Sequence, residues 1–328
     1  MIFLNVAVLA VGFIALVKGA DIFVDGSSAL ARIFKIPSLI IGLTIVALGT
    51  SMPELAVSTS AALAGSNEIA LSNVVGSNIF NLLVVLGLCA VIHPVPVDSL
   101  ILKRDFPISI FSTLGIFLAV TFPAFLNGSF FTLRMDADAG TVSRTLGIII
   151  LVLFIAYIVY LIFDARKNPL PEEETGGEKL LPLWKCILFI VLGLFLIIAG
   201  GKAVVYSAQN IARFLGMTET LIGLTVVAIG TSLPELVTSI VAARKGETAL
   251  AVGNVLGSNI FNLLFILGVS AAIHPVSVNI ASVYDMAVLI FISVLSWIFS
   301  ITKRRIGRIE GIIMLLFYGA ESVFAIMR

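Results

Sequence analysis

The sequence predicts an all-α membrane protein with ten transmembrane helices, arranged as two inverted-topology repeats of five helices each. Three observations predict this fold class: the composition, a series of long apolar runs, and a duplication of the chain. Of the 328 residues, 59% are hydrophobic and only 12% are charged, and the mean hydropathy is +1.16. A soluble domain carries about a quarter charged residues. The composition therefore indicates a chain that is surrounded mostly by lipid.

Apolar runs of roughly 17 to 25 residues, the length needed to cross a bilayer as a helix, recur along the chain. Backbone polar groups in lipid must be satisfied within the segment, which favours helices, and barrel strands would alternate over about ten residues. The expected spans are 1–24, 39–63, 69–92, 107–126, 146–163, 184–206, 221–243, 249–272, 284–302 and 309–327.

The duplication appears in two motifs. "GLTIVALGTSMPELAVS" at 42–58 matches "GLTVVAIGTSLPELVTS" at 223–239 at twelve of seventeen positions, and "NVVGSNIFN" at 73–81 matches "NVLGSNIFN" at 254–262 at eight of nine. Both pairs are offset by 181 residues, which indicates two halves of one design. A duplication for packing alone is the alternative, but packing would repeat Leu and Ala, whereas the most faithfully repeated residues here are polar.

A polar stretch, "DARKNPLPEEETGGEK", separates the halves. Its composition is typical of a short solvated linker. We therefore expect a first repeat at 1–163, a cytoplasmic linker at 164–182 and a second repeat at 183–328. Because five spans precede the linker, the second repeat enters the membrane from the opposite side, as in many secondary transporters.

Basic residues in the loops predict the orientation. With the N-terminus outside, fourteen basic residues lie inside and four outside, while Lys18 and Lys202 lie within spans. Both termini are therefore expected to be extracytoplasmic, in a multi-pass protein of the cell inner membrane. The inner residues are Arg32, Lys35, Lys103, Arg104, Arg166, Lys167, Lys179, Lys185, Arg244, Lys245, Lys303, Arg304, Arg305 and Arg308, and the outer ones are Arg134, Arg144, Arg213 and Arg328.

Two glutamates, Glu54 and Glu235, occupy matching positions in "GTSxPEL" within apolar runs. A carboxylate in lipid costs roughly 2.5 kcal/mol on insertion scales, so it normally faces a cavity, a partner or an ion pathway. No basic residue lies within either motif, 42–58 or 223–239, to pair with the acid. If the two acids meet near a pseudo-two-fold axis, they repel unless a cation or proton lies between them. The structural alternative is a protonated glutamate that only tightens the bundle.

The residues around the glutamates favour a cation. Thr50 and Glu54 are four residues apart and share a helix face, as do Thr231 and Glu235. Pro53 and Pro234 lack an amide hydrogen, so each helix is expected to break in mid-membrane. Carbonyls near Ala47 and Ala228 would then face a cavity.

The second motif adds further oxygens. Ser77 and Asn81 are four residues apart, as are Ser258 and Asn262. The asparagines on other faces fit a structural role and a ligand role equally well, because asparagine also hydrogen-bonds between membrane helices. They are Asn73, Asn78, Asn254 and Asn259.

These candidates offer carboxylate, hydroxyl, amide and carbonyl oxygens, with no His or Cys among them. Calcium takes six to eight hard oxygen ligands, whereas zinc and copper favour imidazole or thiolate. The same oxygens, divided among smaller sites, could instead hold several sodium ions. The net charge of +1 argues against a nucleic-acid binder.

"GTSMPEL" with "NVVGSNIFN", and "GTSLPEL" with "NVLGSNIFN", resemble the two alpha repeats of sodium/calcium exchangers in the calcium/cation antiporter superfamily, and the short linker resembles prokaryotic members. The resemblance implies a secondary active antiporter, not an enzyme, that exchanges Na⁺ for Ca²⁺ electrogenically by alternating access. It implies Ca²⁺, Na⁺ and the lipid bilayer as partners, with no cofactor and no obligate protein partner. Calcium/proton antiport is the alternative, followed by a channel and an intramembrane enzyme; no HExxH motif is present.

The resemblance also implies roles for individual residues. Glu54, Glu235, Thr50 and Thr231 would hold calcium; Ala47 and Ala228 would give backbone carbonyls; Ser51, Ser77, Ser232 and Ser258 would complete the sodium sites, with Asn81 and Asn262 near the centre. Some relatives carry aspartate at one of these two central positions, so this chain lacks that titratable group. In such proteins the first and sixth helices are thought to slide against the rest, and Gly12, Gly19, Gly193, Gly200 and Gly201 would permit close contacts.

Overall fold

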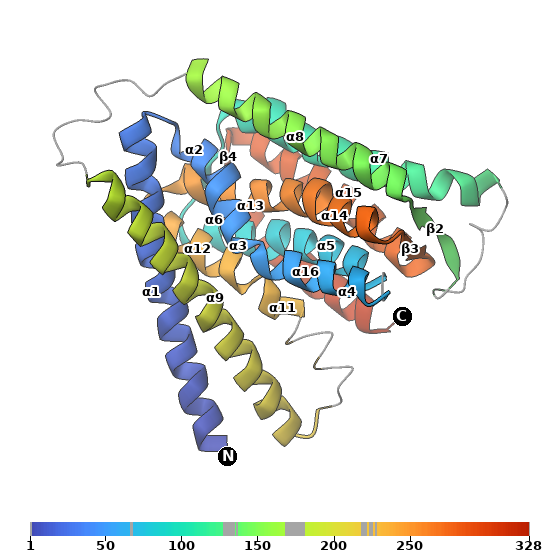
Figure 1. The fold of residues 1–328 in the computed structure, drawn as a ribbon, viewed down its shortest axis with the longest axis horizontal. Coiled ribbons are helices and arrows are strands. Elements are labelled where there is room, and N and C mark those ends of the chain that lie inside the picture. Colours follow the sequence, from blue (N-terminus) through green and yellow to red (C-terminus); the bar gives the residue numbers. More distant parts are fainter. Residues whose placement is uncertain are drawn as a thin grey trace. The chain divides into compact units, whose positions relative to one another are not determined.

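The computed structural model describes residues 2–65, 68–126, 135, 137–167, 181–217, 222, 226 and 228–327. Helix occupies each of the expected apolar ranges in this part of the chain (Figure 1), although 221–243 is described only in part. Among the described residues, seven helices are long and apolar enough to cross a membrane, and an eighth span is added if the bent pair Ser38–Thr50 and Met52–Leu63 is one span. The all-helical membrane class is therefore confirmed. Most of the expected linker lies outside the described residues.

The chain divides into two compact units, each of which contains segments from both sequence halves. Unit 1 comprises Met1–Pro53 and Tyr160–Gly257, and unit 2 comprises Glu54–Val159 and Ser258–Arg328. The compact units and the sequence repeats are therefore different divisions of the chain. Consequently, Glu235 belongs to unit 1 and Glu54 to unit 2.

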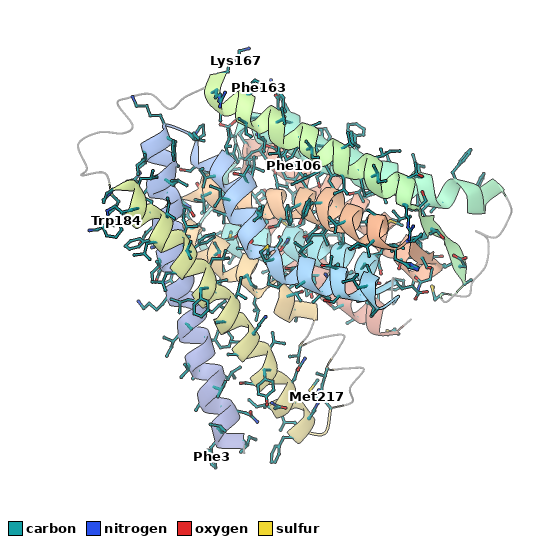
Figure 2. All side chains as sticks on the ribbon, viewed as in Figure 1. Phe3, Phe106, Phe163, Lys167, Trp184 and Met217 are labelled. Atoms are coloured by element: carbon teal, nitrogen blue, oxygen red, sulfur yellow. The ribbon has the colours of Figure 1, made fainter. Side chains whose placement is uncertain are left out.

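Unit 1 is built around two long antiparallel helices, α1 and α9, which lie side by side in Figure 1. Figure 2 labels Phe3 and Met217 at one end of this pair and Trp184 at the other. The remaining helical segments include the bent pair's first half and the segment that carries Glu235. The elements are α1 (Ile2–Phe34), α2 (Ser38–Ile41), the π-helical η1 (Gly42–Val46), α3 (Ala47–Thr50), α9 (Leu183–Phe214), α11 (Ala228–Thr231), α12 (Leu233–Arg244) and α13 (Thr248–Ile260), whose last turn enters unit 2.

Helix α1 corrects the expected span 1–24, because it continues to Phe34. At 33 residues it is about 50 Å long, well beyond the ~30 Å of hydrocarbon. Lys18, Asp21 and Asp25 lower the hydropathy without ending the helix. Lys245 at the end of α12 supports this part, since its Nζ lies 2.7 Å from an Asp25 carboxylate oxygen and 3.6 Å from one of Asp21.

Unit 2 packs its helices around α5, α15 and α16. Buried leucines of α5 and of the segments that follow it, such as Leu71, Leu83 and Leu86, contribute to its apolar core. Its helical elements are α4 (Met52–Leu63, from Glu54), α5 (Glu68–Phe80), η2 (Asn81–Val85), α6 (Leu86–Ile92), η3 (Ile101–Asp105), α7 (Phe106–Leu126), α8 (Arg144–Lys167, to Val159), η7 (Phe261–Ile266), α14 (Leu267–Ile273), α15 (Ile280–Lys303) and α16 (Arg308–Met327).

Short strands, which the hydrophobic pattern does not predict, join the loops of unit 2. β1 (Val95–Pro96) pairs antiparallel with β4 (Arg305–Ile306), and β2 (Asp138–Val142) pairs antiparallel with β3 (Val276–Asn279). β1 and β3 each begin at the valine of a repeated "HPV", and each pairs with a loop from the other half of the sequence. In each half of the sequence, the strand that follows "HP" therefore pairs with a strand from the other half.

Candidate functional site

The helix that carries Glu54 is bent next to Pro53, as the proline predicts. The helix direction bends by 50° between Ser38–Thr50 and Met52–Leu63, with Ser51 between them. Glu54 lies in the first turn of α4, where backbone N–H groups that lack helical partners stabilise a negative charge. The expectation of a broken helix is confirmed here.

The segment that carries Glu235 repeats this arrangement. Ser232 separates α11 from α12, Pro234 lies at the start of α12, and Glu235 is in its first turn. Most of the turn before α11 lies outside the described residues, so the bend itself is described only for the first half. Ala228, whose backbone carbonyl is one of the expected cation ligands, is the first residue of α11.

The candidate residues are almost all buried. The side chains of both glutamates are 0% exposed, and among the other candidates only Thr231 is partly exposed, with the burial of Ala228 not described. Carboxylates removed from solvent to this extent require compensation by hydrogen bonds or cations. Both glutamates do receive hydroxyl hydrogen bonds.

In unit 1, Ser51 and Thr50 reach the segment of Glu235. Ser51 Oγ donates to Glu235 Oε1 at 2.7 Å, and Thr50 Oγ1 donates to Asn254 Oδ1 at 3.0 Å. Asn254 Nδ2 in turn donates to Ser239 Oγ at 2.9 Å and to the Glu235 carbonyl at 3.4 Å. Unit 1 thus gathers three expected residues, Thr50, Ser51 and Glu235, and adds Asn254.

In unit 2, the segment of Glu54 is held partly by corresponding bonds. Ser77 Oγ lies 3.5 Å from Glu54 Oε1, at the limit for a hydrogen bond. Asn73 Nδ2 donates to Ser58 Oγ at 3.0 Å and to the Glu54 carbonyl at 3.3 Å. These bonds repeat those of Asn254 at the offset of 181 residues.

The expected release of the carbonyl near Ala47 is not observed. The Ala47 oxygen accepts the amide hydrogen of Ser51 at 3.0 Å, because the helix continues through α3 before it bends. A carbonyl oxygen has two lone pairs, so one acceptor position remains. Ala47 can therefore serve as a ligand only in addition to its helical hydrogen bond.

Four asparagines of unit 2 form a reciprocal network. Asn78 Nδ2 donates to the Asn259 carbonyl at 3.1 Å, and Asn259 Nδ2 donates to the Asn78 carbonyl at 3.4 Å. Asn81 Nδ2 donates to Asn259 Oδ1 at 3.2 Å, and Asn262 Nδ2 donates to Asn78 Oδ1 at 3.0 Å. The side-chain oxygens of Asn81 and Asn262 are buried and accept no hydrogen bond from the described residues. Such oxygens are suited to bind a cation.

The sequence left the roles of Asn73, Asn78, Asn254 and Asn259 open, and it missed Ser58 and Ser239. The structure gives all six residues hydrogen bonds that hold the segments of the site. Ser58 and Ser239 close the repeated "GLT…S" motif at the common offset, and that repetition was the signal that could have identified them. In unit 1, Thr231 is the last residue of α11, and Ser232 lies between α11 and α12. Ser258 lies in unit 2 near the end of α13.

The long apolar helices, with the candidate oxygens buried among them, define a multi-pass membrane protein. A family model described as sodium/calcium exchanger protein matches residues 4–163 and 185–327. The chain therefore belongs to the sodium/calcium exchanger protein family, which confirms the resemblance carried by the repeated motifs.

Individual relatives match over nearly the whole chain. The sodium/calcium exchanger MaX1 of Methanosarcina acetivorans is 34% identical, over 98% of this chain and 99% of its own. The inner membrane protein YrbG of Escherichia coli is 36% identical, over 89% and 87%. A solved structure of the sodium-calcium exchanger NCX_Mj, soaked without Na⁺ and Ca²⁺, superposes with a TM-score of 0.79 at 31% identity and covers 100% of both chains.

Proposed function

We propose that this protein is a secondary active antiporter that exchanges Na⁺ for Ca²⁺ across the cell inner membrane by alternating access. The observation that carries the proposal is the pair of fully buried glutamates, each in a duplicated motif and each hydrogen-bonded by a serine hydroxyl. The names of MaX1 and NCX_Mj, which this chain matches along its whole length, support the same exchange.

The proposed ligands are hard oxygens. Glu54 and Glu235 with Thr50 and Thr231 bind calcium, and two carboxylates balance one divalent charge. The remaining ligands serve sodium and calcium in overlapping positions, so the two ions compete. They are the carbonyls of Ala47 and Ala228, the hydroxyls of Ser51, Ser77, Ser232 and Ser258, and the amide oxygens of Asn81 and Asn262.

We propose ten membrane spans in two inverted repeats, with both termini extracytoplasmic. Contacts that occur twice support the inversion: the Asn78–Asn259 bonds are reciprocal, and so are the pairings of β1 and β3 with loops of the other half. An impermeant thiol reagent should label a cysteine placed at position 2 from outside intact cells.

The test of function is calcium-45 uptake into proteoliposomes. An outward Na⁺ gradient should drive uptake, and an equal K⁺ gradient should not. If three Na⁺ exchange for one Ca²⁺, one net charge moves per cycle, and ~100 mV changes the driving force by about 2.3 kcal/mol. Uptake should therefore respond to a potassium diffusion potential. Uptake driven by a pH gradient in sodium-free vesicles would instead identify a proton antiporter.

Glu54→Gln and Glu235→Gln should each reduce sodium-driven uptake to background, because the amide cannot neutralise a divalent ion. Glu68→Gln is the matched control, since Glu68 is an exposed glutamate at the start of α5 whose side chain accepts a bond from Asn279. Its uptake should equal that of the wild type. Calcium uptake that persists in Glu54→Gln would contradict the proposed site.

A further inference from the structure

The side chain of Asn254 has a fixed orientation. Its Nδ2 lies 3.4 Å from the Glu235 carbonyl and 2.9 Å from Ser239 Oγ, and a backbone carbonyl can only accept a hydrogen bond. The amide nitrogen must therefore face these two groups. The amide oxygen consequently faces Thr50, at 3.0 Å from its hydroxyl oxygen.

This orientation dictates how Thr50 uses its only hydrogen. Asn254 Oδ1 can only accept, so the Thr50 hydroxyl must donate to it. The lone pairs of Thr50 Oγ1 then remain for a cation. The other acceptor within reach is the Ala47 carbonyl, at the longer distance of 3.4 Å. Without Asn254 the hydroxyl would turn to that carbonyl and occupy the acceptor position that a cation would use.

The asparagine network of unit 2 follows the same rule. Asn78 and Asn259 each direct an amide nitrogen to the other's backbone carbonyl, so their side-chain oxygens must accept from Asn262 and Asn81. The amide nitrogens of Asn81 and Asn262 are thereby occupied. Their oxygens, which are buried and accept no bond from the described residues, are the atoms left for a cation.

We propose that Asn254 is a positioning residue that fixes the hydroxyl of Thr50 as an acceptor toward the transported cation, and that Asn78 and Asn259 fix the amides of Asn262 and Asn81 in the same way. This inference rests on the proposed function, in which Thr50, Asn81 and Asn262 bind ions. None of the three positioning residues needs to touch an ion. Each donates its side-chain N–H to a backbone carbonyl, which can only accept. Its side-chain oxygen must therefore accept a hydrogen bond from the ligand residue.

The expected effect is on ion affinity. A hydroxyl that points its hydrogen at a cation repels it, and groups that orient a ligand are typically worth 10- to 100-fold in metal affinity. Asn254→Ala should therefore raise the Ca²⁺ concentration for half-maximal sodium-driven uptake about tenfold. The maximal rate should change by less than about twofold, because the carboxylates are intact.

A double-mutant cycle with Thr50→Val tests whether Asn254 acts through Thr50. Valine keeps the shape of threonine but has no hydroxyl to orient. In the Thr50→Val background, Asn254→Ala should change the half-maximal Ca²⁺ concentration by less than about twofold. A full tenfold loss in that background would overturn the proposal.

Asn73→Ala is the matched control. Asn73 makes the same two bonds as Asn254, to Ser58 and to the Glu54 carbonyl, but these bonds do not involve Thr50. The fold-changes that Asn73→Ala and Thr50→Val cause in the half-maximal Ca²⁺ concentration should multiply in the double variant, which means that the two residues are not coupled. An equally strong coupling of Thr50 to Asn73 would show that the coupling reflects general loosening of the fold, and would also overturn the proposal.

Ser239→Ala provides a second route if Asn254→Ala does not fold. It removes one acceptor of Asn254 Nδ2 while keeping the amide, so a smaller loss of Ca²⁺ affinity should appear and should vanish in the Thr50→Val background. Calcium-45 binding to purified protein is measured alongside uptake. Wild-type protein that binds Ca²⁺ but shows no sodium-driven uptake would contradict the proposed exchange, whereas the Thr50 cycle on binding would still decide the role of Asn254.

Discussion

The α1–α9 pair of unit 1 and the asparagine network of unit 2, formed by Asn78, Asn81, Asn259 and Asn262, are held together by different chemistry. Gly12, Gly19, Gly193 and Gly200 bring the backbones of α1 and α9 together: a Cβ on Gly200 would lie 2.7 Å from the Gly12 carbonyl, and one on Gly193 would lie 2.6 Å from the amide of Phe23. The asparagine network is joined instead by amide hydrogen bonds between Asn78 on α5 and Asn259 near the end of α13.

The two regions also differ in exposure. In the most apolar window of α1 only 17% of the residues are buried, against 72% for the span Glu68–Ile92. Close glycine packing is apolar and has little directional preference, while hydrogen bonds fix both distance and angle. The asparagine network therefore fixes atoms in place, whereas the glycine interface fixes only the separation of two helices. This fits the expectation that the first and sixth helices slide.

The largest expected effect comes from breaking the asparagine network. Asn259→Leu removes the acceptor of the Asn81 amide and the donor to the Asn78 carbonyl. Leaving a buried polar group unsatisfied costs about 1–3 kcal/mol. The variant should unfold at a lower temperature in detergent and lose sodium-driven calcium uptake.

The double variant Asn259→Leu with Asn81→Leu is the control for this cost. Replacing both partners of a buried hydrogen bond with apolar groups can be nearly neutral, so part of the lost stability should return. Uptake should not return, because the Asn81 oxygen is a proposed ligand. A double variant less stable than Asn259→Leu would show that packing, rather than unsatisfied amides, dominates this region.

A smaller effect is expected at the glycine interface, where two adjacent glycines give a matched pair. A Cβ on Gly200 would lie 2.7 Å from Leu16 N and from the Gly12 carbonyl, whereas one on Gly201 meets nothing nearer than 3.9 Å. Gly200→Ala should cost about 1–3 kcal/mol by overpacking. Gly201→Ala should be neutral or stabilising by up to ~1 kcal/mol through helix propensity. Thermal unfolding in detergent measures both.

Transport separates packing from sliding in the same pair of variants. If the α1–α9 separation matters for movement, Gly200→Ala should slow uptake more than Gly201→Ala does, at unchanged Ca²⁺ affinity. Equal unfolding temperatures and equal rates for the two variants would mean that the glycine contact does not hold α1 against α9.

The sequence predicts the broad features of both regions because hydropathy and repetition are local properties. The helical class, the bend at Pro53 and the burial of Glu54 and Glu235 follow from composition, proline chemistry and the duplicated motif. Gly12 with Gly19, and Gly193 with Gly200, are seven residues apart, so each pair shares a helix face. Gly201 falls off that face, and the spacing could have separated it from the others.

The details of the asparagine region could not be predicted. Asn81 begins one π-helical segment and Asn262 lies in another, and a π-helical turn shifts the face on which every later side chain lies. The hydrogen bonds of Asn78 join residues 181 apart in the chain, so no local pattern identifies its partner. The extension of α1 to Phe34 also depends on tertiary contacts, including that of Lys245 with Asp25.

The smallest expected effect concerns Asn279, an asparagine that contacts none of the proposed ligands in the described residues. Asn279 precedes α15, and its side-chain oxygen accepts the amide hydrogen of Ser282 at 2.8 Å. Removing an N-cap costs typically ~1 kcal/mol, so Asn279→Ala should lower the unfolding temperature slightly, while Asn279→Ser, which keeps a capping oxygen, should not. Sodium-driven uptake should be normal in both, because neither the cap on Ser282 nor the exposed bond to Glu68 involves a proposed ligand. Loss of uptake in Asn279→Ala with normal uptake in Asn279→Ser would mean that the start of α15 affects transport, and the contrast between local and site-orienting asparagines would fail.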